Sequence, residues 1–311
     1  MQLSFPGKVY TMAQVDAAFF PGQGSQSVGM AKNLLQEFPS LKTVFEEAED
    51  SCHLFITRLC LEASSSDLQK TSNQQPCILT MSSAIWKLLE KETAWQPKFY
   101  AGHSLGEYSA LVAAKKLDFS KAVNLVHKRG QFMQEAVPEG LGAMTAVLNF
   151  QAAKLELLCE EISKNSGQEV CIANYNSEKQ LIISGHLEAV SKLEKKLQKE
   201  KARLVRLPVS APFHSPLMAP AKEAMSALLS EELLKDNNKR VYANITGKEA
   251  SPYKISYLLE QIDSPVLWLQ TMQNLAKENL TKIVEVGPGK VLTNLSLRTF
   301  KRSVNCLTSL D

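Results

Sequence analysis

The chain has 311 residues, 44% of them hydrophobic and 22% charged, which is enough for about two globular domains and excludes wholesale disorder. Lys and Arg number 35 against 32 Asp and Glu, and the net charge of +3 does not indicate nucleic-acid binding. No stretch approaches the roughly 20 consecutive apolar residues that a membrane span requires. The six cysteines include no C-x-x-C pair, so we expect no metal site and a cytoplasmic protein with reduced core thiols.

The first residues of the chain lack the apolar run of a secretory signal. Their irregular composition and the second methionine, Met12, predict that residues 1–13 are a leader or vector-derived extension. Ordered structure is expected from about Gln14.

The first half of the chain alternates short apolar runs with helical patterns. Apolar runs that lead into glycine-containing turns predict buried strands at 15–20 and 99–103. Apolar residues at helical spacing predict a helix from about Val28 and helices at 76–89, 107–114 and 120–136. Ser120 is expected to cap the last of these helices.

The pattern changes at residue 143. The expected elements are a strand at 143–150, a helix at 151–163, strands at 169–174 and 180–184, a helix at 187–200 and a strand at 203–208. This β-α-β-β-α-β order is typical of a ferredoxin-like unit.

The remaining elements return to alternation. They are a helix at 219–234, a strand at 240–244, a helix at 265–278 and a strand at 282–286. Strands that alternate with helices predict a parallel sheet of the α/β class. We therefore expect one large α/β subdomain, 14–142 and 209–311, interrupted by a small ferredoxin-like subdomain, 143–208.

The most informative motif is Gly102-His103-Ser104-Leu105-Gly106. The G-x-S-x-G pattern places a serine on a sharp strand-to-helix turn, where its hydroxyl is exposed for nucleophilic attack. The expected strand before the motif and the small-residue helix after it supply the context that such a turn needs. The N–H of Leu105, at the helix start, is positioned to stabilise an oxyanion.

A serine nucleophile needs a general base, and the chain offers few histidines. His214 is preferred because prolines bracket its loop, Pro212-Phe213-His214-Ser215-Pro216, and restrict the backbone. His103 is expected to point away from the serine hydroxyl. His127 reads as a surface residue, and His53 and His186 as solvated or capping residues.

Arg129 falls on the apolar stripe of its predicted helix. Either its stem packs while the guanidinium reaches water, or the guanidinium is buried and holds a carboxylate through two parallel hydrogen bonds. The residues alone do not decide between these two interpretations.

Two glycine-containing turns need separate interpretation. Pro21-Gly22-Gln23-Gly24-Ser25-Gln26 lacks the third glycine of a dinucleotide fingerprint and the G-K-[ST] of a P-loop, so a nucleotide site is not expected. Its backbone N–H groups can instead complete an oxyanion hole. Gly287-Pro288-Gly289 is interpreted as a structural turn.

Taken together, five motifs occur in a familiar order. They are 20–26 (FPGQGSQ), 102–107 (GHSLGE), 128–136 (KRG through MQEA), 212–215 (PFHS) and 285–289 (EVGPG). In this order they resemble the malonyl-CoA:acyl carrier protein transacylases of type II fatty-acid synthesis, over about residues 18–293.

The resemblance implies an α/β-hydrolase-like large subdomain with a ferredoxin-like insertion. It implies Ser104 as nucleophile, His214 as base, and the amides of Gln23 and Leu105 as the oxyanion hole. Further implied roles are a malonyl carboxylate held by Arg129 with His103 nearby, a crowding Phe213 that favours malonyl over methylmalonyl, and a backbone carbonyl of Gln261 that orients the histidine.

The implied reaction is malonyl transfer from malonyl-CoA to acyl carrier protein through a malonyl-serine ester, by a cytoplasmic, monomeric enzyme that needs no cofactor. A discrete acyltransferase of a polyketide synthase is an alternative. A serine thioesterase or hydrolase would share the G-x-S-x-G motif, and a non-catalytic docking domain could retain the fold. Arg129 and the lack of an obvious acid partner for His214 argue against a hydrolase, and the intact set of site residues argues against a scaffold.

Overall fold

The computed structural model describes residues 2–5, 8–11, 15–93, 95–209, 211–300 and 305–308, with side chains for those between 15 and 300. Ser210 and the side chain of Cys306 lie outside the described residues. Strands β1 (Gln2–Phe5) and β2 (Lys8–Thr11) pair as an antiparallel ribbon, so regular structure begins before Gln14, contrary to expectation.

The larger sheet of the described chain runs in the order β10-β9-β4-β3-β11-β12. Its strands are β3 (Ala17–Phe20), β4 (Phe99–Gly102), β9 (Arg240–Ala243), β10 (Lys248–Ala250), β11 (Lys282–Glu285) and β12 (Asn305–Thr308). All neighbours are parallel except β9 and β10. Every residue of β3 and β4 is buried, as parallel strands covered on both faces require.

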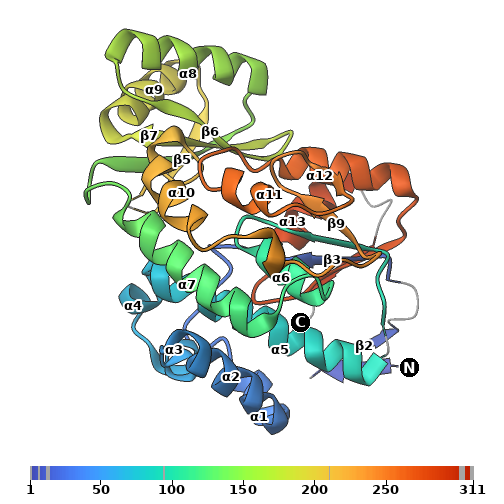
Figure 1. The fold of residues 1–311 in the computed structure, drawn as a ribbon. Helices are drawn as coiled ribbons and strands as arrows, with labels where there is room; N and C mark the ends of the chain where they lie inside the picture. The colour runs from blue at the N-terminus through green and yellow to red at the C-terminus, as the bar shows by residue number, and fades with distance from the viewer. Residues whose placement is uncertain are drawn as a thin grey trace.

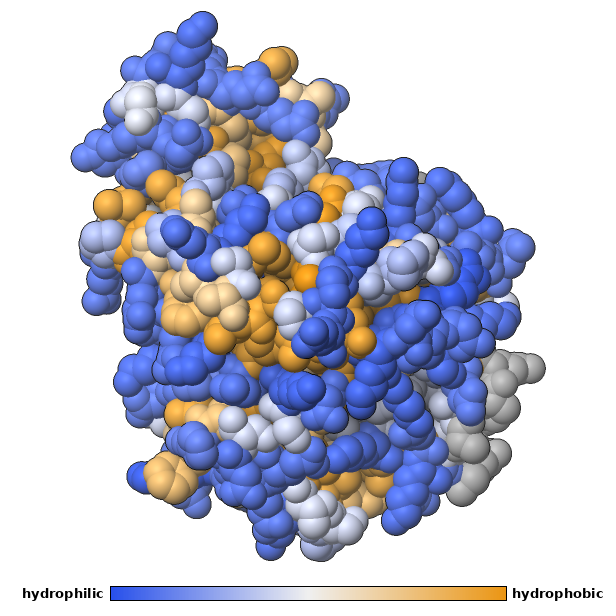
Figure 2. All heavy atoms as spheres, viewed as in Figure 1, coloured by the Kyte–Doolittle hydropathy of each residue, from blue (hydrophilic) through white to orange (hydrophobic). Residues whose placement is uncertain are grey.

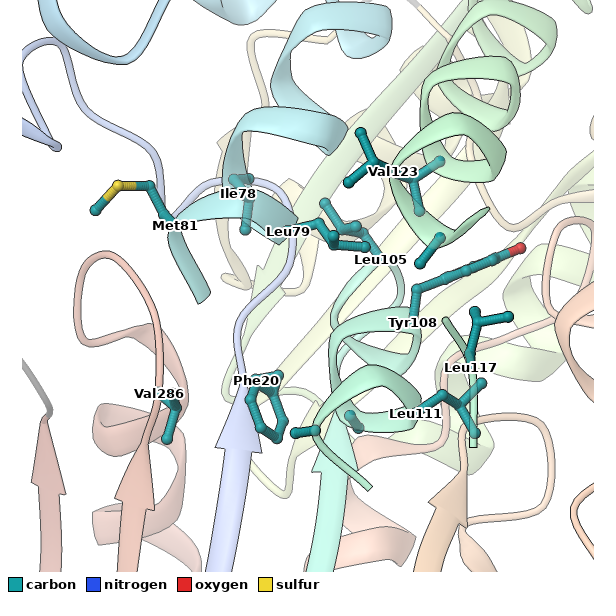
Figure 3. Close-up of a cluster of buried hydrophobic side chains, with 14 of the residues drawn as sticks. Phe20, Ile78, Leu79, Met81, Leu105, Tyr108, Leu111, Leu117, Val123 and Val286 are labelled. Carbon is teal, nitrogen blue, oxygen red and sulfur yellow. The ribbon is translucent and has the colours of Figure 1, made fainter. Parts of the chain in front are cut away.

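Helices cover both faces of this sheet (Figure 1). They are α1 (Lys32–Glu37), α2 (Lys42–Cys52), α3 (Ile56–Glu62), α4 (Ser65–Gln69), α5 (Thr71–Thr93), α6 (Gly106–Ala113), α7 (Phe119–Glu135), α10 (Ala219–Ser226), α11 (Ile255–Glu260), α12 (Trp268–Leu275) and α13 (Val291–Phe300). Phe20 packs with α5 and α6 on one face, and Figure 3 draws it in the same buried cluster as Leu105 and Tyr108. Its neighbour Phe19 points to the opposite face, against Trp268 of α12, because successive strand residues alternate.

Two helix predictions need correction. Asp118, not Ser120, occupies the N-cap position of α7, and the Ser120 hydroxyl donates to Glu47 Oε1 at 2.9 Å instead. The helix expected at 219–234 ends at Ser226, and a short 3-10 turn at Glu231–Leu233 follows. Leu229, between the end of α10 and this 3-10 turn, is buried, so the chain returns toward the core there.

The smaller sheet runs in the order β6-β7-β5-β8 with all neighbours antiparallel. Its strands are β5 (Gly142–Leu148), β6 (Val170–Ser177), β7 (Gln180–His186) and β8 (Arg203–Arg206), and its helices are α8 (Ala152–Ser166) and α9 (Leu187–Lys199). The order confirms the ferredoxin-like prediction. Figure 2 shows hydrophilic outer surfaces on this subdomain with apolar residues beneath them, and Leu155, Leu193 and Leu197 bury the inner faces of the two helices.

Candidate active site

Ser104 occupies the turn between β4 and α6, at the carboxyl edge of the parallel sheet. Its φ of +52° is rare for a residue with a side chain, and such strain persists only where the surroundings enforce it. Asn244, just after the neighbouring strand β9, enforces it here: Asn244 Oδ1 accepts the Ser104 N–H at 2.7 Å, and Nδ2 donates to Gly102 O at 2.6 Å. A Cβ on Gly102 would overlap the backbone of Gly106, so the turn requires the glycines of the motif.

The imidazole of His214 lies against the serine hydroxyl. Ser104 Oγ and His214 Nε2 are 2.8 Å apart, and His214 Nδ1 is 2.7 Å from the carbonyl oxygen of Gln261. A carbonyl can only accept, so Nδ1 carries the proton and Nε2 accepts the hydroxyl hydrogen. The pair therefore has the geometry of a nucleophile and a general base.

Burial sets the charge state of this histidine. His214 is 4% exposed, and desolvation, followed by the positive charge of Arg129, lowers the pKa of His214 to about 3. The imidazole is consequently neutral across the physiological range, which is the form that can accept a proton.

Arg129 of α7 is fully buried, which contradicts the alternative that its head reaches water. Nη1 donates to Gln75 Oε1 at 2.7 Å, and Nη2 donates to Gln261 Oε1 at 2.9 Å and to Ser104 Oγ at 3.2 Å. All three partners are neutral, and Arg129 forms no ion pair within the described part of the chain. The guanidinium therefore presents a positive charge beside the serine.

Two backbone N–H groups remain as candidate oxyanion donors. Neither Gln23 N–H, after β3, nor Leu105 N–H, at the start of α6, donates to another group within the described residues. The side chain of Gln23 is held by Gln74 Oε1 at 2.5 Å and by Thr71 Oγ1 at 3.3 Å. Both N–H groups belong to turns that pack together, because a Cβ on Gly22 would lie 2.4 Å from His103 O.

A cavity of about 240 Å³ opens over the serine. Gln23, His103, Ser104, Phe213 and His214 line it from the large subdomain. The small subdomain contributes Met144, Asn174 and Leu207. A second hollow of about 620 Å³ adjoins the first and shares Leu207 and Phe213 with it.

Of the site residues expected from the sequence, Gln23, His103, Ser104, Phe213 and His214 line the cavity. Leu105, Arg129 and Gln261 lie buried behind it, and the last two bond directly to Ser104. His103 points away from the serine hydroxyl as predicted, with Nε2 2.8 Å from Asn176 Oδ1 and its ring beside Trp268. Burial lowers the pKa of His103. His127, interpreted as a surface residue, is buried instead, and its Nδ1 lies 3.0 Å from Ser72 O, where α7 crosses the start of α5.

Three polar residues at the site were not predicted. Gln75 binds Arg129, Asn244 holds the serine turn, and Glu107 is buried behind it. The only sequence signal is that Glu107 follows the G-x-S-x-G motif directly on a helix of small and apolar residues. Gln75 and Asn244 lie in segments with no recognisable motif.

Across residues 15–300, apart from 94 and 210, no group of His, Cys, Asp or Glu side chains is arranged to hold a metal ion. No helix in the described part of the chain is long and apolar enough to cross a bilayer. The five cysteines whose side chains are described are unpaired, and all but Cys171 are buried.

An α/β fold with a serine–histidine pair beside a buried guanidinium defines a class of serine acyl-transfer proteins. In agreement, the profile of the acyl transferase domain family matches residues 19–309.

The relatives define the family more narrowly. A malonyl CoA-acyl carrier protein transacylase from Bacillus subtilis is 41% identical over 291 residues, covering 92% of this chain and 90% of the relative. The crystal structure of FabD from Acinetobacter baumannii matches with a TM-score of 0.90 at 38% identity, over 95% of this chain and 94% of that one. A type II polyketide synthase acyl-carrier protein has been solved in complex with its malonyl-transacylase, which matches with a TM-score of 0.88 at 35% identity, over 95% of each chain.

The chain therefore belongs to the malonyl CoA-acyl carrier protein transacylases of the acyl transferase family. Its resemblance to this family and the two-subdomain fold expected from that resemblance are both confirmed.

Proposed function

We propose that this protein transfers a malonyl group from malonyl-CoA to the phosphopantetheine thiol of acyl carrier protein, through an ester on Ser104. The observation that carries the proposal is the bonded array Gln261–His214–Ser104–Arg129, which joins a nucleophile, a neutral base and a cation at the base of the cavity. The names of the relatives support malonyl as the acyl group.

In the first half-reaction, Ser104 Oγ attacks the thioester carbonyl while its proton passes to His214 Nε2. The N–H groups of Gln23 and Leu105 stabilise the negative oxygen of the tetrahedral intermediate. The intermediate collapses as the C–S bond breaks, and the CoA thiolate takes the proton from the imidazole. In the second half-reaction, the carrier-protein thiol gives its proton to His214 and attacks the ester, and Ser104 recovers the proton as it leaves.

The remaining residues act on the substrate and on the base. The carbonyl of Gln261 holds the His214 ring in its acting tautomer, as the 2.7 Å contact supports. Arg129 binds the free malonyl carboxylate, and His103 lies near it. Phe213, 6% exposed at the cavity wall, crowds the position of a branching methyl group, which is worth about 1–3 kcal/mol of selectivity.

A second candidate acceptor is the carrier protein of a type II polyketide synthase. The solved complex of such a carrier with its malonyl-transacylase, 35% identical to this chain, favours keeping this alternative. Loading each class of carrier protein in competition distinguishes the two acceptors. Comparing CoA release with and without a carrier separates both from a thioesterase.

The principal test replaces the nucleophile. Intact-mass spectrometry after mixing with malonyl-CoA should find one malonyl adduct on the wild type and on Ser226→Ala, a control serine on the surface of α10. Ser104→Ala should carry none. An adduct that persists on Ser104→Ala would refute the assignment.

We propose further that the enzyme acts as a cytoplasmic monomer without a cofactor. A site built entirely within one chain supports the monomer, and light scattering tests it. We also propose the subdomain boundaries 14–142 with 209–311, and 143–208, with residues 1–13 as an extension. The strands of the small sheet, which span Gly142 to Arg206, support this division.

A further inference from the structure

The carboxylate of Glu107 takes no part in the serine–histidine step, yet it lies fully buried three residues after the nucleophile. It accepts hydrogen bonds from Tyr253 Oη at 2.6 Å, from the N–H of Asn244 at 3.2 Å and from Gln261 Nε2. A buried carboxylate costs free energy unless donors surround it, and this one has three. Such an arrangement calls for a role of its own.

Gln261 connects this carboxylate to the rest of the site. Its Nε2 donates to Glu107 and to Ser104 O at 3.1 Å, and its Oε1 accepts from Arg129 Nη2 at 2.9 Å. A carboxylate only accepts, so Glu107 fixes which end of the amide faces it and leaves Oε1 for Arg129. The same residue orients His214 through its backbone carbonyl. Glu107 therefore acts on both the cation and the base through one side chain.

The charge of Arg129 explains why Glu107 contacts it through the Gln261 amide and not directly. Arg129 has only neutral partners in direct contact, and its Nε has no acceptor among the described residues. A carboxylate bonded directly to the guanidinium would occupy the position of the substrate carboxylate. Because the Gln261 amide separates it from Arg129, Glu107 offsets the buried positive charge and leaves the guanidinium free to bind the substrate carboxylate. Among the residues that the structure describes, the other titratable groups that face Glu107 are Tyr253 and, on its own helix, Tyr108.

We propose that Glu107 is a positioning residue that holds the Gln261 amide toward Arg129, and that Glu107 takes up a proton when the substrate carboxylate binds to Arg129. This inference rests on the proposed function, because it assigns a carboxylate-bearing acyl group to the site. The proton comes from solvent and adds to a carboxylate oxygen of Glu107. No other bond forms or breaks.

The direction of the coupling follows from electrostatics. Burial raises the pKa of Glu107 to about 7, and its hydrogen bonds and Arg129 only partly oppose that rise. A substrate carboxylate bound to Arg129 adds a second negative charge near Glu107. This charge disfavours the ionised form of Glu107 and raises the pKa of Glu107 further. Binding and protonation are reciprocal, so malonyl-CoA binds more tightly at low pH.

The experiment uses Ser104→Ala, which binds malonyl-CoA without turnover. Isothermal titration calorimetry between pH 6 and 8.5, in two buffers of different ionisation enthalpy, measures Kd and proton uptake. Acetyl-CoA is the matched ligand, since it has the same nucleotide and phosphates but no free carboxylate. Malonyl-CoA should take up a fraction of a proton more than acetyl-CoA does. Its Kd should rise about fivefold or more across this range, whereas that of acetyl-CoA stays flat.

Two variants in the same background locate the proton. Glu107→Gln should abolish the extra uptake and the pH dependence. Tyr253→Phe removes an O–H donor that lowers the pKa of Glu107, so the pH dependence should move to higher pH. Equal proton uptake for the two ligands, or uptake that persists in Glu107→Gln, would overturn the role of Glu107. The malonyl adduct on wild-type Ser104 is measured in parallel, and its absence would overturn the proposed function instead.

Discussion

At the scale of single residues, burial is the main influence on the charge state of His214, the proposed base. His214 is oriented by a neutral carbonyl, and desolvation holds the pKa of His214 near 3 instead of its usual value near 6.5. Between these two values the unfolded chain binds a proton that the folded His214 does not. This residue therefore lowers the free energy of unfolding as pH falls from about 6.5 to about 3.

The same shift predicts the pH profile of acylation. Single-turnover formation of the malonyl-serine ester at saturating malonyl-CoA should vary less than about twofold from pH 5 to 8, because the base stays neutral throughout. Rapid-quench mass spectrometry measures this rate. A loss of rate with an inflection near pH 6.5 would mean that His214 titrates normally in the complex.

A second prediction concerns the buried guanidinium. Arg129→Ala should lower malonyl-serine formation by about 10- to 100-fold more than acetyl-serine formation, because only malonyl loses a charged hydrogen bond. Arg129→Lys should recover part of this loss at most, since an ammonium cannot present two parallel N–H groups. Rapid-quench loading with each acyl-CoA measures the ratio. Equal losses for the two acyl groups would remove the carboxylate role.

Residues in motifs could be found from the sequence, whereas their supporting partners could not. Ser104 stands in a pattern whose glycines are sterically required, and His214 stands between prolines. Gln75, Glu107 and Asn244 became partners of the site only through folding, since each bonds a residue 54 or more positions away. A helical stripe placed Arg129 on the buried face, but only its three-dimensional contacts excluded a solvent-exposed head.

At the scale of elements, the packing of α7 on α5 determines where Arg129 lies. A Cβ on Gly130 would lie 2.6 Å from Thr71 O and 2.8 Å from Ser72 Cα, so only glycine allows this approach. The adjacent Arg129 reaches Gln75 of α5 across the same contact. The glycine after the arginine thus belongs to the site through helix packing.

Gly130→Ala should therefore separate the two helices slightly. We expect the free energy of unfolding to fall by about 1–3 kcal/mol, and malonyl loading to fall more than acetyl loading. Chemical denaturation and rapid-quench loading measure the two effects. Gly167→Ala is the control, because Gly167 caps α8 with φ +66° in open space, and should lose stability without changing the loading ratio. An unchanged ratio in Gly130→Ala would contradict this account.

Element predictions succeeded where one periodicity dominated. Every strand of the two sheets except β10 and β12 was expected, and so were the long helices α5, α7, α8 and α9, because alternation and helical spacing are strong there. The N-cap of α7 was misplaced because the Ser120 hydroxyl bonds Glu47, 73 positions away. The short elements β10, β12, α4 and α11 were not predicted, since three to six residues carry too little pattern.

At the scale of the whole molecule, strand β5 of the small sheet is buried on both faces. Ala143 and Val147 of β5 pack beneath α8 and α9, whereas Met144 and Ala146 join the core of the large subdomain. Val266 links the large subdomain to strand β6 of the small one by two backbone hydrogen bonds. The Val266 N–H donates to Ala173 O at 2.9 Å, and the Tyr175 N–H donates to Val266 O at 3.0 Å. The insertion thus shares its core with the large subdomain and forms one wall of the cavity.

This shared core predicts that the molecule unfolds as one unit. Separating the insertion would expose the apolar face that carries Met144 and Ala146, so neither part should persist without the other. All three tryptophans, Trp86, Trp95 and Trp268, lie outside 143–208 and report on the large subdomain, whereas far-UV circular dichroism reports on the whole chain. In urea the two signals should give the same midpoint. A dichroism transition that precedes the fluorescence transition would mean that the insertion melts alone, and the cavity would then lose a wall before the large subdomain unfolds.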